Sequence, residues 1–226
     1  MIKNDKLKSR LKKYIILKGD IMRSITKIEF MWLILSVVTM GFCLSFLDRT
    51  ALGTDPCTMF NLGMADLLHI SLGNWQALFN SILFIFVFLF AKDQIGWGTI
   101  ANMFLVGYSF DFFSWLNHKL LSDALFQNMV ARILITFPIL ALFILAASIY
   151  ISIQQGTAPY DAIPFILHRK FNKLSFKVVR MGWDISVFIL GFLLGSKAGI
   201  VTIIMAFAFG PAIAYTQKHI ISKLIP

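Results

Sequence analysis

Charge is what this sequence has least of. Asp, Glu, Lys and Arg make up only 14% of its 226 residues, against about 25% in soluble domains. The apolar share is 58% and the mean hydropathy is +0.77. A soluble chain of this composition could not cover its core with polar surface, which excludes an ordinary globular domain. The sequence therefore predicts that lipid is the solvent, and the 23 phenylalanines fit because Phe inserts favourably into hydrocarbon.

Metal ligands and catalytic motifs are also scarce. The two cysteines, Cys43 and Cys57, have no CxxC partner, and the four histidines are scattered. This pattern predicts no metal site and favours two structural thiols, although a disulfide between them is left open. HExxH and GxSxG are absent from the sequence. We therefore expect no catalytic residues, no cofactor and no enzyme activity.

Positive charge is in excess, at a net +10, but its distribution argues against nucleic-acid binding. Most Lys and Arg fall in residues 1–27 and 169–180, outside the apolar runs. Residues 1–27 are predicted to be a basic cytoplasmic segment and not a cleaved signal peptide. Its apolar residues at helical spacing predict an amphipathic helix on the inner leaflet, with a disordered basic tail as the alternative.

The apolar runs predict an all-α polytopic membrane protein with a single membrane domain over residues 28–226. A helix needs roughly 20 mostly apolar residues to cross the hydrocarbon. Six segments qualify, some with a polar residue inside: about 30–47, 75–91, 95–116, 133–153, 179–196 and 198–216.

Basic residues in the loops predict the orientation. With the N-terminus inside, cytoplasmic segments collect 17 Lys and Arg and external segments collect 4, out of the 21 in the chain. Cytoplasmic loops of membrane proteins carry such an excess. Both termini are therefore predicted to be cytoplasmic.

A shift of 103 positions aligns the sequence with itself. Gly53, Thr54 and Pro56 then fall on Gly156, Thr157 and Pro159. Matches continue from 96–107 onto 199–210 in the same register. This predicts two three-helix repeats, 28–116 and 130–216, and an odd number of spans makes them inverted. The Gly-Thr-x-Pro segments predict short helices, interfacial or re-entrant, in 53–70 and 156–171.

The first half also resembles a known group of proteins. Gly53 and Pro56 are followed by a Gly-x-Gly-Thr-x-x-Asn stretch and then by Asp, which here are Gly96, Gly98, Thr99, Asn102, Gly107 and Asp111. This pattern resembles the YczE/YyaS/YitT group of bacterial integral membrane proteins. The resemblance implies a multi-pass protein of the bacterial plasma membrane, and it implies little about chemistry.

Polar residues inside apolar segments are costly there and are therefore candidates for function. Asp111 in the third span is the clearest. Arg180 and Asp184 are four residues apart and predict a structural ion pair on one helix face. The sign of a bound solute stays open, because helix N-termini favour an anion whereas the neighbouring carboxylates favour a cation. The predicted substrate-binding residues are Thr54, Asp55, Asn80, Asn102, Asp111, Thr157, Asp161 and Asp184.

Inverted repeats with interrupted helices are typical of transporters and channels. We therefore expect a transporter or channel for a small solute, with the lipid bilayer as its main surroundings. Two alternatives remain at this point: a substrate-capture subunit of a larger transporter, and a non-transporting regulator or anchor of a cytoplasmic partner. The sequence leaves open a homo-oligomer or a partner subunit, and nucleic acid is not expected as a partner.

Overall fold

The computed structural model describes residues 23–221, and this part of the chain is helical without strands. The amphipathic helix predicted near the N-terminus lies in residues 1–22, outside the described part. The helices are α2 Lys27–Thr50, α3 Pro56–Leu68, α4 Leu72–Phe90, η1 Lys92–Gln94, α5 Trp97–Leu120, α6 Ala124–Gln127, α7 Met129–Ser152, α8 Pro159–Lys170, α9 Phe176–Leu193, α10 Ile200–Thr216 and η2 Gln217–Ile221.

Side-chain caps fix several helix starts. Thr26 and Glu29 form a capping box at the start of α2. Asp55 caps α3, with Pro56 at the first helical position where no amide donor is needed. Ser71 and Ser175 cap α4 and α9 in the same way. The two short helices expected after the Gly-Thr-x-Pro segments are thus present as α3 and α8.

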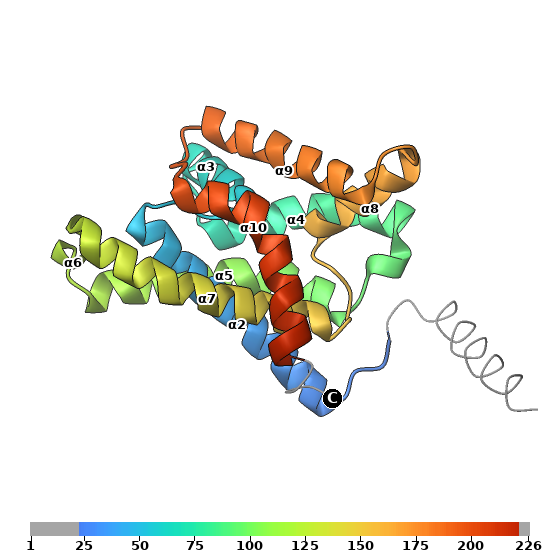
Figure 1. The fold of residues 1–226 in the computed structure, drawn as a ribbon, viewed down its shortest axis with the longest axis horizontal. Coiled ribbons are helices and arrows are strands. Elements are labelled where there is room, and N and C mark those ends of the chain that lie inside the picture. Colours follow the sequence, from blue (N-terminus) through green and yellow to red (C-terminus); the bar gives the residue numbers. More distant parts are fainter. Residues whose placement is uncertain (1–22, 222–226) are drawn as a thin grey trace, which may run out of the picture.

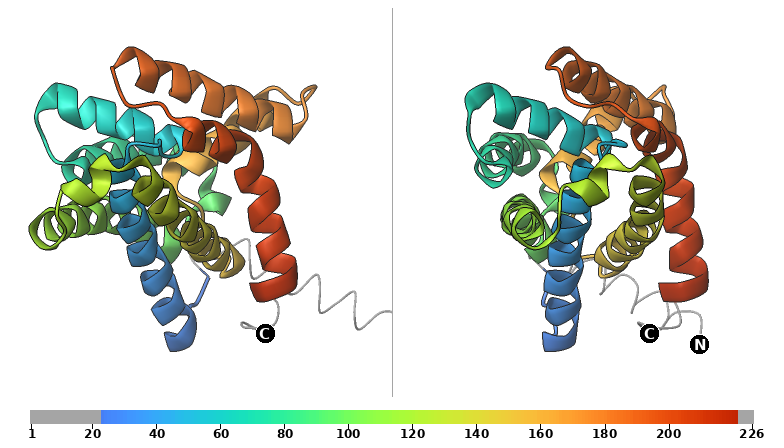
Figure 2. Two further views of the ribbon diagram at one scale, coloured as in Figure 1. Left: turned by 60° about the vertical axis from the view of Figure 1, so that its left-hand side comes forward. Right: turned by 90° about the vertical axis from the view of Figure 1, so that its left-hand side faces the viewer.

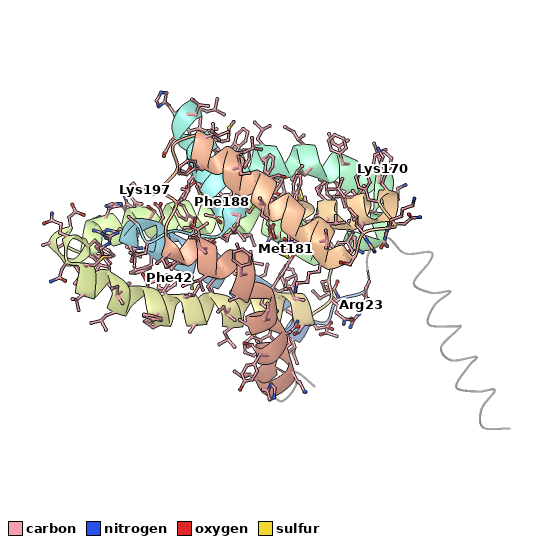
Figure 3. All side chains as sticks on the ribbon, turned by 45° about the horizontal axis from the view of Figure 1, so that its top comes forward. Arg23, Phe42, Lys170, Met181, Phe188 and Lys197 are labelled. Carbon is pink, nitrogen blue, oxygen red and sulfur yellow. The ribbon has the colours of Figure 1, made fainter. Side chains whose placement is uncertain are left out.

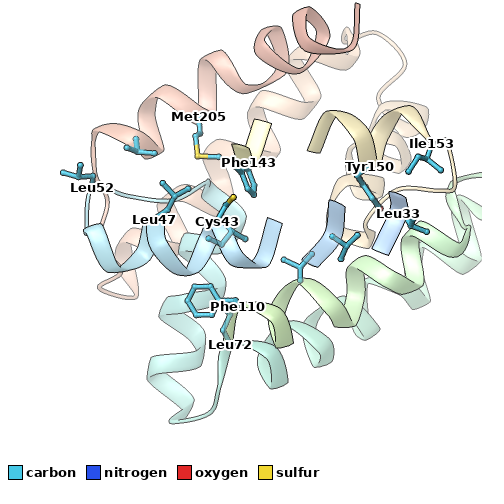
Figure 4. Close-up of a cluster of buried hydrophobic side chains, with 14 residues drawn as sticks. Leu33, Cys43, Leu47, Leu52, Leu72, Phe110, Phe143, Tyr150, Ile153 and Met205 are labelled. Carbon is cyan, nitrogen blue, oxygen red and sulfur yellow. The ribbon is translucent and has the colours of Figure 1, made fainter. Parts of the chain in front are cut away.

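The core is built around α2, which lies between α5 and α7 (Figures 1 and 2). Figure 4 shows Cys43 and Leu47 of α2 between Phe110 of α5 and Phe143 of α7, and Leu33 of α2 beside Tyr150 of α7. The three α2 side chains have no exposed surface. Fully burying a large apolar side chain stabilises the fold by about 1.5–3 kcal/mol in water; in lipid the gain comes mainly from close packing.

Polar contacts show which ends of these helices meet. The Arg49 guanidinium, near the end of α2, donates to the carbonyl of Leu121 just after α5 and pairs with Asp123 at 2.8 Å. Arg132, near the start of α7, donates to the carbonyl of Thr50. Helices α2 and α5 therefore run in the same direction, and α7 runs in the opposite direction.

A second layer contains α3, α4, α8 and α9 (Figure 1). Here α3 packs on α9, and α4 packs on α8. When 103 is added to the residue numbers of α4, the result is 175–193, which matches α9 to within one residue. The same shift places α2 on α7 and α3 on α8. Each of these two packings is therefore the counterpart of the other under that shift.

The backbone contacts between the halves are reciprocal as well. Val201 N–H donates to the Leu52 carbonyl at 3.0 Å, and Gly98 N–H donates to the Gln155 carbonyl at 2.6 Å. Both residues of the first contact lie 103 positions from residues of the second. Gly53 and Gly156 follow the two acceptors with φ of 106° and 90°, a region that favours glycine.

Within residues 23–221, four helices are long and apolar enough to cross a membrane by length and composition: α2, α4, α7 and the segment Ile200–Ile221. The other two predicted spans are helical, as α5 and α9, but they do not reach that apolarity. Helix α9 carries Lys177, Arg180 and Asp184, and α5 carries Asn102 and Asp111 among other polar residues. Large apolar side chains cover the outer faces of the helices (Figure 3).

Candidate functional site

A cavity of about 130 Å³ lies where eight helices meet, α2 to α5 and α7 to α10. It has room for several water molecules, because one water needs only about 10–15 Å³ by this measure. Its walls are formed by Met40, Leu44, Asp55, Pro56, Cys57, Thr58, Gln76, Asn80, Asn102, Val106, Phe143, Ala147, Tyr150, Ile151, Ala158, Tyr160, Asp161, Arg180, Asp184, Met205, Ala206 and Phe209.

A charged cluster from α8 and α9 forms one wall. Arg180 pairs with Asp161 at 2.8 Å and with Asp184 at 2.9 Å. Tyr160 O–H donates to the other Asp184 oxygen at 2.8 Å, and its ring lies 5.6 Å from the Arg180 guanidinium carbon. One arginine therefore holds two carboxylates, so the predicted Arg180–Asp184 contact is one side of a three-residue network.

The two short helices both begin at the cavity. Asp55 caps α3 by accepting from the Thr58 N–H at 3.0 Å. Asp161 lies in the first turn of α8. Asp55 lies within electrostatic range of Asp161 and Asp184. The cavity is thus lined by two helix starts and three carboxylates.

Three carboxamides also line the cavity. Gln76 and Asn80 are four residues apart on α4, and Asn102 comes from α5. They are 8%, 3% and 7% exposed, yet within residues 23–221 none of the three side chains makes a hydrogen bond. Buried polar side chains normally have partners. These amides are therefore the part of the site that is chemically least satisfied.

The remaining predicted residues lie elsewhere. Asp111 accepts from the Gly73 N–H at 2.9 Å and so caps the start of α4. Thr54 lines a second cavity of about 170 Å³ near the end of α2. Thr157 donates its N–H to the Gln94 carbonyl at 3.0 Å. The structure therefore brings together Asp55, Asn80, Asn102, Asp161 and Asp184, and leaves Asp111, Thr54 and Thr157 outside the central cavity.

Gln76 and Tyr160 line the site without having been predicted there. A signal for each exists in the sequence. Gln76 precedes Asn80 by one helical turn, which places both on one face. Tyr160 follows the Pro159 of the second Gly-Thr-x-Pro segment. Within the described residues no three His, Cys, Asp or Glu side chains come close enough together to hold a metal ion, so the site is suited to hydrogen bonding and charge pairing.

An ion pair lies at the end of α4, beyond the cavity. Arg169 at the end of α8 pairs with Asp93 at 2.6 Å and donates to the Phe90 carbonyl at 3.2 Å. The hydrogen bond from Arg169 lowers the pKa of Asp93 below its ordinary value. This contact joins the turn between α4 and α5 to the end of α8.

Fold and site together define a helical membrane protein with several apolar helices around a buried polar cavity. The chain belongs to a family of unknown function, DUF6198, which matches residues 27–218. It is 28% identical over 192 residues to an uncharacterized protein of Haemophilus influenzae, covering 84% of this chain and 82% of that protein.

A second relative bears out the resemblance seen in the sequence. The uncharacterized membrane protein YczE of Bacillus subtilis is 22% identical over 190 residues, which covers 84% of this chain and 85% of that protein. The predicted kinship with the YczE group is therefore confirmed. No solved structure matches the chain.

Proposed function

We propose that this protein is a transporter or channel for a small solute in the bacterial plasma membrane, and that the central cavity is its solute site. The protein crosses the membrane six times, as two inverted three-helix repeats, 28–116 and 130–216. Both termini are cytoplasmic, and α3 and α8 are re-entrant helices. Lipid contacts the apolar outer faces.

The cavity lining supports the inverted repeats. Under the shift of 103, Met40 corresponds to Phe143, Cys57 to Tyr160 and Asn102 to Met205, and all of these line the cavity. Further pairs are Leu44 with Ala147, Asp55 with Ala158, Thr58 with Asp161 and Val106 with Phe209. A cavity lined by matched positions from both halves lies on their shared axis, which is where inverted-repeat transporters bind their solutes.

Helix directions support six spans. Helix α5 has 24 residues, like α2, and runs beside it in the same direction. Because α2 spans the membrane in this proposal, α5 spans it too and in the same direction. Helix α9 has 18 residues, or about 27 Å at 1.5 Å per residue, close to the roughly 30 Å of hydrocarbon. Two of its three charged residues, Arg180 and Asp184, line the cavity, which lowers the cost of placing them in a span.

The distribution of basic residues between the two ends of the structure supports the orientation with cytoplasmic termini. Lys170 and Lys197 lie at opposite ends of the structure (Figure 3). Lys170 belongs to the basic stretch 169–180, which includes the turn between α8 and α9. Lys197 lies in a turn with no second Lys or Arg nearby in sequence. The positive-inside rule assigns the Lys170 end to the cytoplasm.

The observation that carries the function is the charged and amide-lined cavity inside a protein with an apolar exterior. Charges and unpaired amides inside a membrane protein weaken a purely structural scaffold. They are retained in membrane proteins mainly along solute pathways.

Solute flux into proteoliposomes tests this proposal. Guanidinium, urea, nitrate and alanine serve as the solutes, with protein-free liposomes as the baseline. We expect at least one solute to enter faster with the protein, and Asp161→Asn to slow that entry by tenfold or more. Asp111→Asn is the matched control, because Asp111 lies outside the cavity, and it should keep near-normal flux.

The proposal fails if none of the four solutes crosses faster than in protein-free liposomes. It also fails if Asp161→Asn and Asp111→Asn lower flux equally in folded protein.

A further inference from the structure

The three carboxamides of the central cavity need hydrogen-bonding partners that the protein does not supply. Gln76, Asn80 and Asn102 are each more than nine-tenths buried and make no side-chain hydrogen bond within the described residues. None of their amide atoms is among the fully enclosed polar atoms without a partner in residues 23–221, so these atoms are open to the cavity. All three line the same cavity, which is the pattern expected where a polar ligand completes the network.

The formal charges of the other polar lining residues indicate the sign of that ligand. Asp55, Asp161 and Asp184 face a single arginine, Arg180. The starts of α3 and α8 each add about half a positive charge. The lining therefore keeps a net formal charge near minus one, which a monovalent cation would neutralise.

Free acceptor atoms also favour a cation. Asp184 uses one oxygen for Tyr160 and the other for Arg180. Within residues 23–221, Asp55 accepts from Thr58 and Asp161 pairs with Arg180 through one oxygen, which leaves acceptor capacity on both carboxylates. The amides add three carbonyl oxygens, each of which can accept. A ligand with several N–H groups could therefore donate to carboxylates and to amides of the same cavity.

The rest of the cavity argues for an organic cation over a metal ion. Leu44, Val106, Phe143 and Phe209 form apolar wall between the polar groups, and the rings of Phe143 and Phe209 stack at 5.4 Å. Within residues 23–221 the carboxylates are not close enough to one another to make a metal site. Aromatic faces also attract organic cations.

We infer that the central cavity binds a small monovalent organic cation whose charge is carried by N–H groups, of the ammonium or guanidinium type. Asp55 and Asp161 bind the charge, and Gln76, Asn80 and Asn102 accept the remaining N–H groups. This inference rests on the cavity being the solute site, as proposed above, but it does not require that the bound cation be transported.

Binding to purified protein in detergent tests the inference with three matched probes. Guanidinium, urea and nitrate are planar, have the same number of non-hydrogen atoms and differ in charge. Each is added at low millimolar concentration, and the unfolding temperature is measured, since a ligand that binds the folded state raises it. Potassium chloride at the same concentration controls for ionic strength.

We expect guanidinium to raise the unfolding temperature, whereas urea, nitrate and potassium chloride do not. Asp55→Asn should weaken the apparent affinity for guanidinium about ten- to hundredfold, because a charge-assisted hydrogen bond is lost. Asn is as good a helix cap as Asp, so this variant keeps the start of α3. Asp111→Asn, outside the cavity, should bind guanidinium like the unaltered protein.

A response to urea, nitrate or potassium chloride that equals or exceeds the response to guanidinium would overturn the inference, and so would no response to any of them. Guanidinium binding without flux in proteoliposomes would leave the inference standing and remove the transport proposal. Flux that Asp161→Asn slows, together with no binding of guanidinium, would leave the transport proposal standing and remove the inference.

Discussion

The two halves of this protein have the same helices in the same order but differ in how tightly they pack. In the first half α4 lies along α5, and Gly107 comes so close to Gly73 that an added Cβ would meet its Cα at 2.8 Å. In the second half α9 and α10 touch only sparsely, and a Cβ on Gly210, the counterpart of Gly107, would meet nothing within 4 Å.

The halves also differ in what they give to the cavity. The first half contributes neutral amides and one carboxylate, whereas the second contributes Tyr160, Asp161, Arg180 and Asp184. Corresponding helices of the two halves thus contribute different chemistry to the cavity. The closely packed half supplies amides and the loosely packed half supplies most of the charges, so relative movement of helices costs least packing in the second half.

The largest effect we predict comes from the matched glycines. Gly107→Val should destabilise the protein by about 1–3 kcal/mol, because overpacking pushes α5 off α4. Gly210→Val should change stability by less than about 0.5 kcal/mol, since its side chain meets open space. Unfolding in mixed detergent micelles measures both variants, and similar losses would show that the two halves pack alike.

Removing the shared arginine should have the next largest effect. Arg180→Gln leaves Asp161 and Asp184 near each other without their cation. The cost lies between that of a surface pair and that of a fully buried pair, about 1–3 kcal/mol, because these side chains are partly exposed. The Arg180→Gln, Asp161→Asn, Asp184→Asn triple variant should recover most of the loss. If it does not, the arginine acts by packing and not by charge.

The three amides of the cavity should respond in the opposite direction. Asn80→Leu removes a buried polar group that makes no hydrogen bond within the described residues, so stability should stay level or rise by up to about 1 kcal/mol, while guanidinium binding falls. Ser81→Ala, the next residue, is the control, because the Ser81 hydroxyl is already satisfied by the Ala77 carbonyl at 2.7 Å. Destabilisation by Asn80→Leu alone would contradict the account of these amides.

The smallest effect concerns the ion pair of Arg169 with Asp93. The pKa of Asp93 is lowered in the folded protein, so its contribution is complete above the ordinary pKa of Asp, about 3.9, and is lost as the pH falls through the lowered value. Both side chains are about half exposed, and the pair should be worth only about 0.2–1 kcal/mol. Asp93→Asn should lower stability by that amount at neutral pH and by less in acid, as unfolding measured against pH would reveal.

Much of the architecture could be predicted from the sequence because its signals are local. Apolar runs, the Gly-Thr-x-Pro helix starts and the relation to the YczE group follow from residues close together in the chain. The polar content of α5 and α9 is local too, and it explains why these two helices are not among the four in the described part of the chain that count as spans by composition.

The residues that line the cavity could be predicted only in part. Asp55, Asp161 and Asp184 stand out because charges are rare in this chain. Asp111 stands out for the same reason, but its partner, the Gly73 N–H, comes from the start of another helix, and no spacing in the sequence reveals that contact. The grouping of the three amides depends on α4 and α5 facing the same cavity, which is likewise a property of the folded chain.

Labelling of Cys57 tests the central claim most directly, because it needs no knowledge of the solute. Cys57 lines the cavity, whereas Cys43 is fully buried in the core. With Cys43→Ala, Cys57 is the chain's one remaining cysteine, and a membrane-impermeant cationic thiol reagent is applied in mildly alkaline buffer to right-side-out and to inverted vesicles. A solute pathway predicts labelling of Cys57 from both sides, with protection by guanidinium. Labelling from neither side, or from one side only, would contradict it.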